Sequence, residues 1–486
     1  MSVMSLPGRL IRRCAHHYAQ GGLGHAIRQT TMESQLHVMQ SWQAHLFDRF
    51  RRQRAQRFGA DLRGLRCPGE PGLVSVVLPV YNGAALVAQA LDSVLAQSYE
   101  NFELIAINDG SKDDSARILD SYASRDSRIR VVHQENRKLP RTLSRGFRMA
   151  RGEYLTWTSD DNLLRPECLE KLVGCLLRHP SWDMTYANED LIDAQGQPLR
   201  GSSYFLPNQS PAGSEHIVFP ESSARLNTVM YNYVGAAFMY RSRVAYLLGD
   251  YSPLRFTVED YDYWLQVNTL LNLHHADFAE PIYDYRFHGE SLTARIDQLG
   301  GKSHLERLME FDTLRRERFK LPILWLLEDV SGSSEGRLII AALRARAEAG
   351  GQHLRLWGDE LPLPQVSPST PSLYLRLAGH EQAHEPPPEA LRGGAVTLTA
   401  LALLDGKAPA PGQVHADWDV CAALGSGDPD GPGQSQSQSP SQLQTPRLRP
   451  ESYQGLWRAD DVGTLFCALD VRCRAEQARM LEAQLG

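Results

Sequence analysis

The chain has 486 residues, of which 42% are hydrophobic and 22% are charged, and its formal net charge is −6. This composition excludes collagen-like, disulfide-scaffold and wholly disordered proteins. The length predicts two to four domains, and no apolar run approaches the roughly 18 residues of a membrane span.

The N-terminal residues lack the apolar core of a signal peptide, and the seven cysteines include no C-x-x-C pair. We therefore expect free thiols and a cytoplasmic protein. Residues 1–70 form a basic arm in which arginines far outnumber acidic residues. Within it, Trp42, Leu46 and Phe50 recur at helical spacing, which predicts a helix that packs this stripe on the next domain. The alternative is a basic amphipathic helix in peripheral contact with the inner membrane surface or with nucleic acid. Of these two partners, we expect the membrane surface and not nucleic acid.

From residue 73 onward, strand-like runs alternate with helical patterns. The runs "LVSVVLPVYN", "FELIAINDGS", "IRVVHQEN" and "EYLTWTSDDN" are rich in β-forming residues, and a helical pattern follows each. This alternation predicts an α/β fold with a parallel sheet and helices on both faces. Ligands of such sheets bind beyond the carboxyl ends of the strands. Three polar turns are expected there, at residues 81–82, 109–111 and 160–162.

The pattern divides the chain into five parts. The basic arm (1–70) precedes the first α/β domain (71–320) and a smaller C-terminal α/β unit (321–424). Residues 425–450 have low complexity and are expected to be disordered. Residues 451–486 are predicted to form a C-terminal helical segment.

Several acidic residues have two interpretations each. Asp160 and Asp161 are candidate N-caps of the following helix, or ligands of a cation that binds an anionic substrate. Asp109 either binds a ligand or belongs to a turn that is closed by a capping box from Ser111 to Asp114. Glu259 and Asp260 suit the positive end of the next helix, or a catalytic role.

Four segments in order resemble the family 2 glycosyltransferases of the GT-A fold. They are "SVVLPVYNGAALVAQALDSVLAQSYENFELIAINDGSKDDS", "ARGEYLTWTSDDNLLRPECLEKLV", "TVEDYDYWLQV" and "YDYRFHGESLTAR". The resemblance covers residues 73–295 and implies a nucleotide-sugar-binding sheet. It decides between the interpretations above in favour of ligand binding and catalysis.

The resemblance implies a role for each polar group at the donor site. Asp161 is the implied metal ligand and Asp160 the implied ribose contact, with Mn²⁺ or Mg²⁺ as the metal. Asp109 accepts a ring N–H of the base, and three residues pack near that base: Pro79, Val80 and Tyr81. His288 is a second metal or diphosphate ligand, and two arginines are expected to neutralise phosphate: Arg286 and Arg295.

On the acceptor side, the resemblance implies that Asp260 is the general base and that Glu259 is the second choice for this role. Trp264 is expected to pack its helix. The family's L-N-x-G pattern appears here as Leu143-Ser144-Arg145-Gly146, and the Q-x-x-R-W signature of processive synthases is absent. A non-processive enzyme is therefore expected.

The implied function is metal-dependent, inverting transfer of a hexose from a nucleoside-diphosphate sugar, most simply a UDP-sugar. The expected acceptor is a hydroxyl of a glycan or a lipid-linked sugar, as in polysaccharide biosynthesis. The alternative is a non-catalytic scaffold or binding protein on a retired transferase domain. A nucleotidyltransferase is disfavoured because "PVYNGAALV" carries no Gly-rich, basic phosphate loop.

Overall fold

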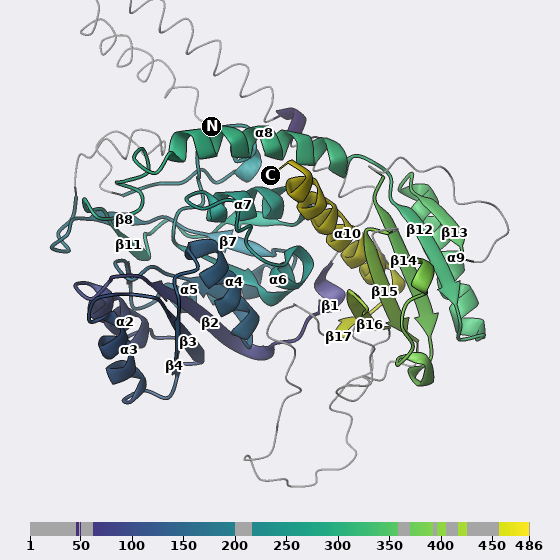
Figure 1. The fold of residues 1–486 in the computed structure, drawn as a ribbon, viewed down its shortest axis with the longest axis horizontal. Helices are drawn as coiled ribbons and strands as arrows, with labels where there is room; N and C mark the ends of the chain where they lie inside the picture. Colours follow the sequence, from purple (N-terminus) through teal and green to yellow (C-terminus); the bar gives the residue numbers. More distant parts are fainter. Residues whose placement is uncertain are drawn as a thin grey trace, which may run out of the picture.

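The computed structural model describes residues 45–47, 49, 62–199, 216–357, 370–391, 396–404, 417–424 and 456–485. Two α/β units lie side by side, with helix α10 (Val462–Leu485) between them (Figure 1). Most of the predicted basic arm and the whole predicted disordered stretch, 425–450, lie outside the described residues. Of the predicted apolar stripe, Leu46 is described and is 40% exposed, whereas the neighbouring Phe47 is buried. No described helix combines the length and the apolar character needed to cross a bilayer.

The first unit is built on a seven-stranded sheet in the order β10-β7-β9-β5-β2-β3-β4. The four strands on one side are parallel: β5 (Gly152–Trp157), β2 (Glu70–Val80), β3 (Phe102–Asp109) and β4 (Ile129–Gln134). Strand β9 (Phe238–Arg241) runs antiparallel to β5 and to β7 (Met184–Tyr186), and β10 (Leu273–His275) extends the far edge. The predicted parallel α/β arrangement is confirmed for the first four strands.

Helices cover both faces of this sheet, as predicted. Alternate residues of β2 point to opposite faces, so Val77 packs with helix α4 (Leu139–Met149). Val76 packs on the other face with α2 (Val87–Leu95) and α5 (Cys168–Arg178). Helix α3 (Ser115–Ala123) lies beside β3 and β4. Helices α6 (Ser242–Leu248) and α7 (Glu259–Leu270) pack with Phe238 and Tyr240 of β9. A small sheet of β6 (Leu163–Leu164), β11 (Tyr283–Arg286) and β8 (Asp190–Ile192) lies next to the strand ends.

The second unit contains another seven-stranded sheet, in the order β1-β17-β16-β15-β14-β12-β13. Its strands are β12 (Leu324–Asp329), β13 (His353–Leu356), β14 (Ser372–Ala378), β15 (Leu398–Leu403), β16 (Val420–Leu424), β17 (Leu456–Ala459) and β1 (Leu65–Arg66). All are parallel except β1, which pairs antiparallel with β17. Helix α9 (Ser334–Ala349) connects β12 to β13.

This sheet differs from the predicted domain boundaries at both ends. Strand β1 comes from the predicted arm, and β17 comes from the predicted C-terminal segment. Both are short, so their sequences carry little strand periodicity of their own. The large sheets of the two units therefore contain the same number of strands.

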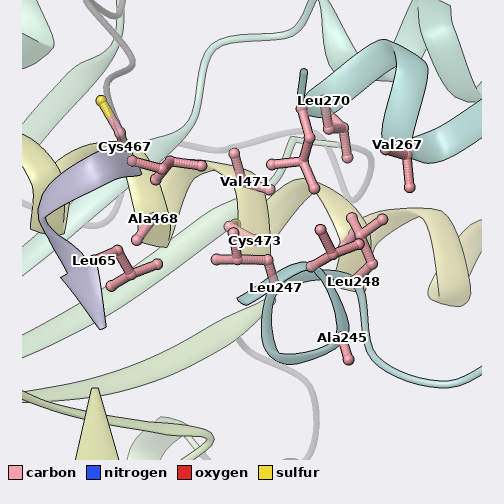
Figure 2. Close-up of a cluster of buried hydrophobic side chains, with 14 of the residues drawn as sticks. Leu65, Ala245, Leu247, Leu248, Val267, Leu270, Cys467, Ala468, Val471 and Cys473 are labelled. Carbon is pink, nitrogen blue, oxygen red and sulfur yellow. The ribbon is translucent and has the colours of Figure 1, made fainter. Parts of the chain in front are cut away.

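Helix α10 joins the two units through one hydrophobic core. On one side it contacts Leu65 of β1, and on the other it contacts Leu247 and Leu248 of α6 (Figure 2). The α10 side chains in this cluster are Cys467, Ala468, Val471 and Cys473. Because residues of both units belong to the same buried cluster, they are expected to unfold together.

Candidate active site

The carboxyl ends of the parallel strands bring the predicted polar turns to one edge. In the ladder, Val80 of β2 is opposite Asn108 of β3, and Trp157 of β5 is opposite Val77 of β2. The turns after β2 and β3 are bonded to each other. The Asn82 backbone N–H donates to Ser111 Oγ (3.0 Å), and Gly83 N–H donates to Ser115 Oγ (3.0 Å). This edge is therefore fixed before any ligand binds.

Asp109 ends β3 and is only 4% exposed. Its Oδ1 accepts hydrogen bonds from Gln134 Nε2 (2.7 Å) and from the Arg137 backbone N–H (2.7 Å). The capping box that was the alternative for this turn is not formed, because the Ser111 N–H donates to Asn108 Oδ1 (3.0 Å) and Asp113, not Ser111, accepts from the Ser115 N–H at the start of α3 (3.0 Å). Of the three residues expected near a base, Pro79 and Val80 are buried in β2, and Tyr81 is 52% exposed.

Asp160 lies directly against the turn after β2. Its pKa is raised to about 7, chiefly by burial and next by the charge of Asp161, although a hydrogen bond from the Tyr81 backbone acts in the opposite direction. A Cβ on Gly83 would lie 2.1 Å from Asp160 Oδ2. The close approach of this carboxylate to the turn thus requires glycine at position 83.

Asp161 and His288 face each other. His288 Nε2 lies 3.1 Å from Asp161 Oδ2, and Ser159 Oγ donates to Asp161 Oδ1. His288 Nδ1 accepts from the Glu290 backbone N–H (3.3 Å), which places the ring proton on Nε2. Helix α5 begins only at Cys168, so the acidic pair does not cap it. The N-capping interpretation of Asp160 and Asp161 is therefore wrong.

Arg286 is 1% exposed, and its guanidinium donates only to protein acceptors in the described structure. They are Asp161 O (2.7 Å), Asp193 O (3.1 Å), Ala194 O (3.0 Å) and Gln89 Oε1 (2.9 Å). These bonds give Arg286 a structural role in fixing the backbone of Asp161. Its contact with phosphate stays a prediction, as does that of Arg295, which is exposed.

Glu259 and Asp260 are the first two residues of α7. Burial raises the pKa of both carboxyl groups, and in Glu259 the neighbouring Asp260 raises it further. Glu259 Oε2 is buried and has no hydrogen-bond partner among the described residues. Asp260 Oδ2 accepts from Asn232 Nδ2 (3.0 Å), and Oδ1 accepts from the Tyr261 N–H (2.6 Å). Trp264 is fully buried among aromatic rings, which confirms its predicted packing role.

The Tyr285 hydroxyl connects the donor and acceptor sides. Burial raises the pKa of Tyr285, and a hydrogen bond with Thr293 opposes this rise. The charges of Asp161, Glu189 and Asp260 raise it further. The charges of the strand-end acid Asp161 and of the helical acid Asp260 therefore act on the same hydroxyl group, although the two acids are far apart in the sequence.

Glu189 is an acid of this site that sequence analysis did not predict. It is 1% exposed, and burial raises its pKa to about 7. Its Oε2 accepts from the Ala236 N–H (2.9 Å). The available signal was the Glu189-Asp190 pair, which follows β7 in the way that Asp160-Asp161 follows β5.

Asp161 and His288 fit a divalent ion if the proton of His288 moves from Nε2 to Nδ1, which would replace the contact with the Glu290 N–H. Two neighbouring ligands of an octahedral ion, each about 2.1 Å from it, lie about 3 Å apart. The Asp161 Oδ2 to His288 Nε2 separation is 3.1 Å. No cluster of three or more His, Cys, Asp or Glu side chains that could hold a metal occurs in the described part of the chain. An ion here would therefore take its remaining ligands from substrate or water.

Comparison with known proteins agrees with the resemblance. Residues 75–246 match the family model "Glycosyl transferase family 2". An uncharacterized glycosyltransferase of Rickettsia felis is 32% identical over 236 residues, which cover 47% of this chain and 36% of that protein. An uncharacterized glycosyltransferase of Rickettsia typhi is 31% identical over 198 residues, which cover 40% of this chain and 58% of that protein. The chain thus spans between about a third and three fifths of these relatives.

Among solved structures, S. aureus TarS residues 1–349 in complex with UDP is 17% identical. It covers 50% of this chain and 65% of its own, with a TM-score of 0.36. The family assignment rests on the sequence match and not on this structural score. Residues 75–246 therefore form a family 2 glycosyltransferase domain.

Proposed function

We propose that the chain is a metal-dependent, inverting glycosyltransferase. It transfers a hexose from a nucleoside-diphosphate sugar, with UDP as the first candidate nucleotide, to a hydroxyl of a glycan or a lipid-linked acceptor. One observation supports the proposal: a chain of contacts links the two sides of the site. Asn232 donates to Asp260, and the Ala236 N–H of the same segment donates to Glu189, which precedes β8. Strand β8 pairs with β11, whose Arg286 donates to the Asp161 backbone.

On the donor side, Asp109 accepts a ring N–H of the base through its carboxylate, and Asp160 accepts from the ribose hydroxyls. The turn of Asn82 and Gly83 holds Asp160 in place. Asp161 and His288 would hold Mn²⁺ or Mg²⁺, which when bound supplies Lewis-acid stabilisation of the diphosphate leaving group. Arg286 keeps the Asp161 backbone in position.

On the acceptor side, Asp260 takes the proton of the acceptor hydroxyl. That oxygen forms the new bond to the anomeric carbon, and the bond from this carbon to the diphosphate breaks with its electron pair. Attack opposite to the leaving group inverts the anomeric configuration. Such a base contributes about 10²–10⁴-fold in rate. Burial of Asp260 raises its pKa, which makes it a stronger base than an exposed aspartate.

The retired-domain alternative gives no reason for the buried acids. Glu259 Oε2 lies buried without a hydrogen-bond partner in the described part of the chain, and because such a group costs stability, a function explains it better than packing does. The absence of the Q-x-x-R-W signature supports one sugar per encounter. Peripheral membrane contact through the basic arm stays a proposal, because most of the arm lies outside the described residues.

Two isosteric substitutions test the proposal separately on each side. After a screen of nucleotide sugars with Mn²⁺ and Mg²⁺, Asp260→Asn should keep donor affinity and lower transfer by about 10²-fold or more. Asp161→Asn should remove the metal dependence of donor binding in calorimetry. Asp114→Asn is the control, since Asp114 is exposed and pairs with Arg117. Near wild-type turnover of the Asp260 variant would contradict the assignment of the base.

A further inference from the structure

The segment between residues 230 and 237 lies against the proposed base. It leads into β9, and its Asn232 side chain contacts Asp260, 28 residues further along the chain. Asn232 Nδ2 lies 3.0 Å from Asp260 Oδ2. Neither the family resemblance nor the comparisons give Asn232 a role.

The orientation of the Asn232 amide follows from its second contact. Asn232 Oδ1 accepts from the Val234 backbone N–H (3.1 Å). A backbone N–H can only donate, so the amide oxygen must face Val234 and the NH₂ group must face Asp260. The hydrogen bond to the carboxylate is therefore donated by Asn232.

Glu189 and Gly235 fix the segment that carries Asn232. The Ala236 N–H donates to Glu189 Oε2 (2.9 Å). Gly235 has φ +68°, and a Cβ at this position would lie 2.4 Å from the Phe219 ring and 2.9 Å from Glu189 Oε2. This close packing requires glycine at position 235, and the Ala236 hydrogen bond to Glu189 holds the segment next to Asp260.

We propose that Asn232 is a positioning residue for the general base: its amide fixes the orientation of the Asp260 carboxylate and stabilises the charged form that accepts the acceptor proton. The proposal rests on the function proposed above. A hydrogen bond to a carboxylate favours the ionised form, whereas burial favours the neutral form. Asn232 thus favours the ionised form of a half-buried aspartate that forms no ion pair with a cation among the described residues.

The other titratable groups around Asp260 do not replace this contact. Glu259 precedes it on α7, and burial together with the charge of Asp260 raises the pKa of Glu259, so Glu259 supplies no donor that fixes the Asp260 carboxylate in its ionised form. Tyr251 and Tyr285 respond to the charge of Asp260, and burial raises the pKa of both tyrosines, so they stay neutral. The amide of Asn232 is the side-chain donor to Asp260 that the described structure provides.

The test is a carbon-13 NMR titration of the full chain with labelled aspartate, in which Asp260→Asn assigns the signal. Asn232→Ala should raise the pKa of Asp260 by about one unit. Asn232→Asp, which keeps the size, should raise it more, because it removes the donor and adds a like charge. Thr228→Ala is the control, since the Thr228 hydroxyl donates only to Arg225 O (3.1 Å) in the same region.

Kinetics give the second measurement. The acidic limb of the kcat/KM profile should move to higher pH in Asn232→Ala by the same amount as the NMR titration, with the donor KM unchanged. Wild-type titration of Asp260 in both Asn232 variants would overturn the inference. Failure of the proposed function looks different: no nucleotide sugar would be turned over, while the NMR shift would persist. If Asn232→Ala does not fold, the isosteric Asn232→Asp decides the question.

Discussion

Adding a single methyl group at Gly83 is expected to weaken donor binding without an effect on folding. Because a Cβ here would lie 2.1 Å from Asp160 Oδ2, Gly83→Ala must displace that carboxylate. We expect nucleotide affinity to fall by about tenfold, or roughly 1.4 kcal/mol, with little change in Tm. Isothermal calorimetry and thermal unfolding measure the two effects.

The matched control for this prediction is Gly174→Ala in α5. There the nearest atom to a Cβ is the flexible end of Arg178, at 3.2 Å. This variant should bind nucleotide like the wild type, since α5 tolerates alanine. Wild-type affinity in Gly83→Ala would show that Asp160 does not contact the donor.

Glu189 makes the stability of the protein depend on pH. Burial raises its pKa from 4.5 to about 7. Below pH 4.5 it is protonated in both the folded and the unfolded state, and above pH 7 it is ionised in both. Its contribution to the free energy of unfolding therefore falls between these values, by about 3 kcal/mol.

We accordingly expect Glu189→Gln to match the wild type at pH 5 and to be more stable by up to about 3 kcal/mol at pH 8. Glutamine keeps an acceptor for the Ala236 N–H. Urea unfolding at the two pH values measures the difference, with the exposed Glu310→Gln as control. An equal stability gain at both pH values would rule out titration as the cause.

At the scale of elements, the start of α7 depends on a strained residue. Thr257 has φ +78°, which is unusual for a β-branched residue, and its Oγ1 lies 2.9 Å from His304 Nδ1 of α8 (Gly301–Phe319). Such strain costs about 1–3 kcal/mol. The hydrogen bond to α8 helps to offset it, and the turn places Glu259 and Asp260 at the helix N-terminus.

Two substitutions distinguish the strain from the hydrogen bond. Thr257→Val loses the bond and keeps the strain, so its free energy of unfolding should fall by about 1–2 kcal/mol. Thr257→Gly loses the same bond but relieves the strain, so it should be the more stable of the two variants. Urea unfolding gives the order. If the valine variant proves the more stable, the backbone at residue 257 is not strained in solution.

Elements with a clear periodicity were predictable from the sequence. Strands β2, β3 and β5 and helices α4 and α5 lie where apolar alternation and helical spacing indicated them. Contacts between distant segments were not predictable, since nothing local in the sequence links Asn232 to Asp260 or β1 to β17. Asp160 and Asp161 resemble N-caps locally, and only the intervening β6 separates them from a helix.

At the scale of the whole molecule, α10 holds the two units together, so a destabilising substitution in α10 should destabilise both units. Val471 is 1% exposed in the shared core (Figure 2). Val471→Asp buries an unpaired carboxylate and should cost several kcal/mol. Hydrogen exchange should then accelerate in β2 and β3 as well as in β14 and β15.

Met480→Asp on the same helix is the control, because Met480 is 39% exposed and the introduced carboxylate would reach water. This variant should leave exchange in both sheets close to that of the wild type. If Val471→Asp accelerates exchange in the second sheet alone, the two units fold independently, contrary to the shared core.

The pairing of β1 with β17 has a consequence for synthesis on the ribosome. Arg66 and its partner Asp460 are 394 residues apart, and the whole first unit is translated between them. At about 5–20 residues per second, roughly 20–80 s pass before the second sheet acquires its last neighbour. From the synthesis of Leu248 until that of α10, the nascent chain presents an apolar surface at Leu247 and Leu248, so we expect chaperones to shield it until release.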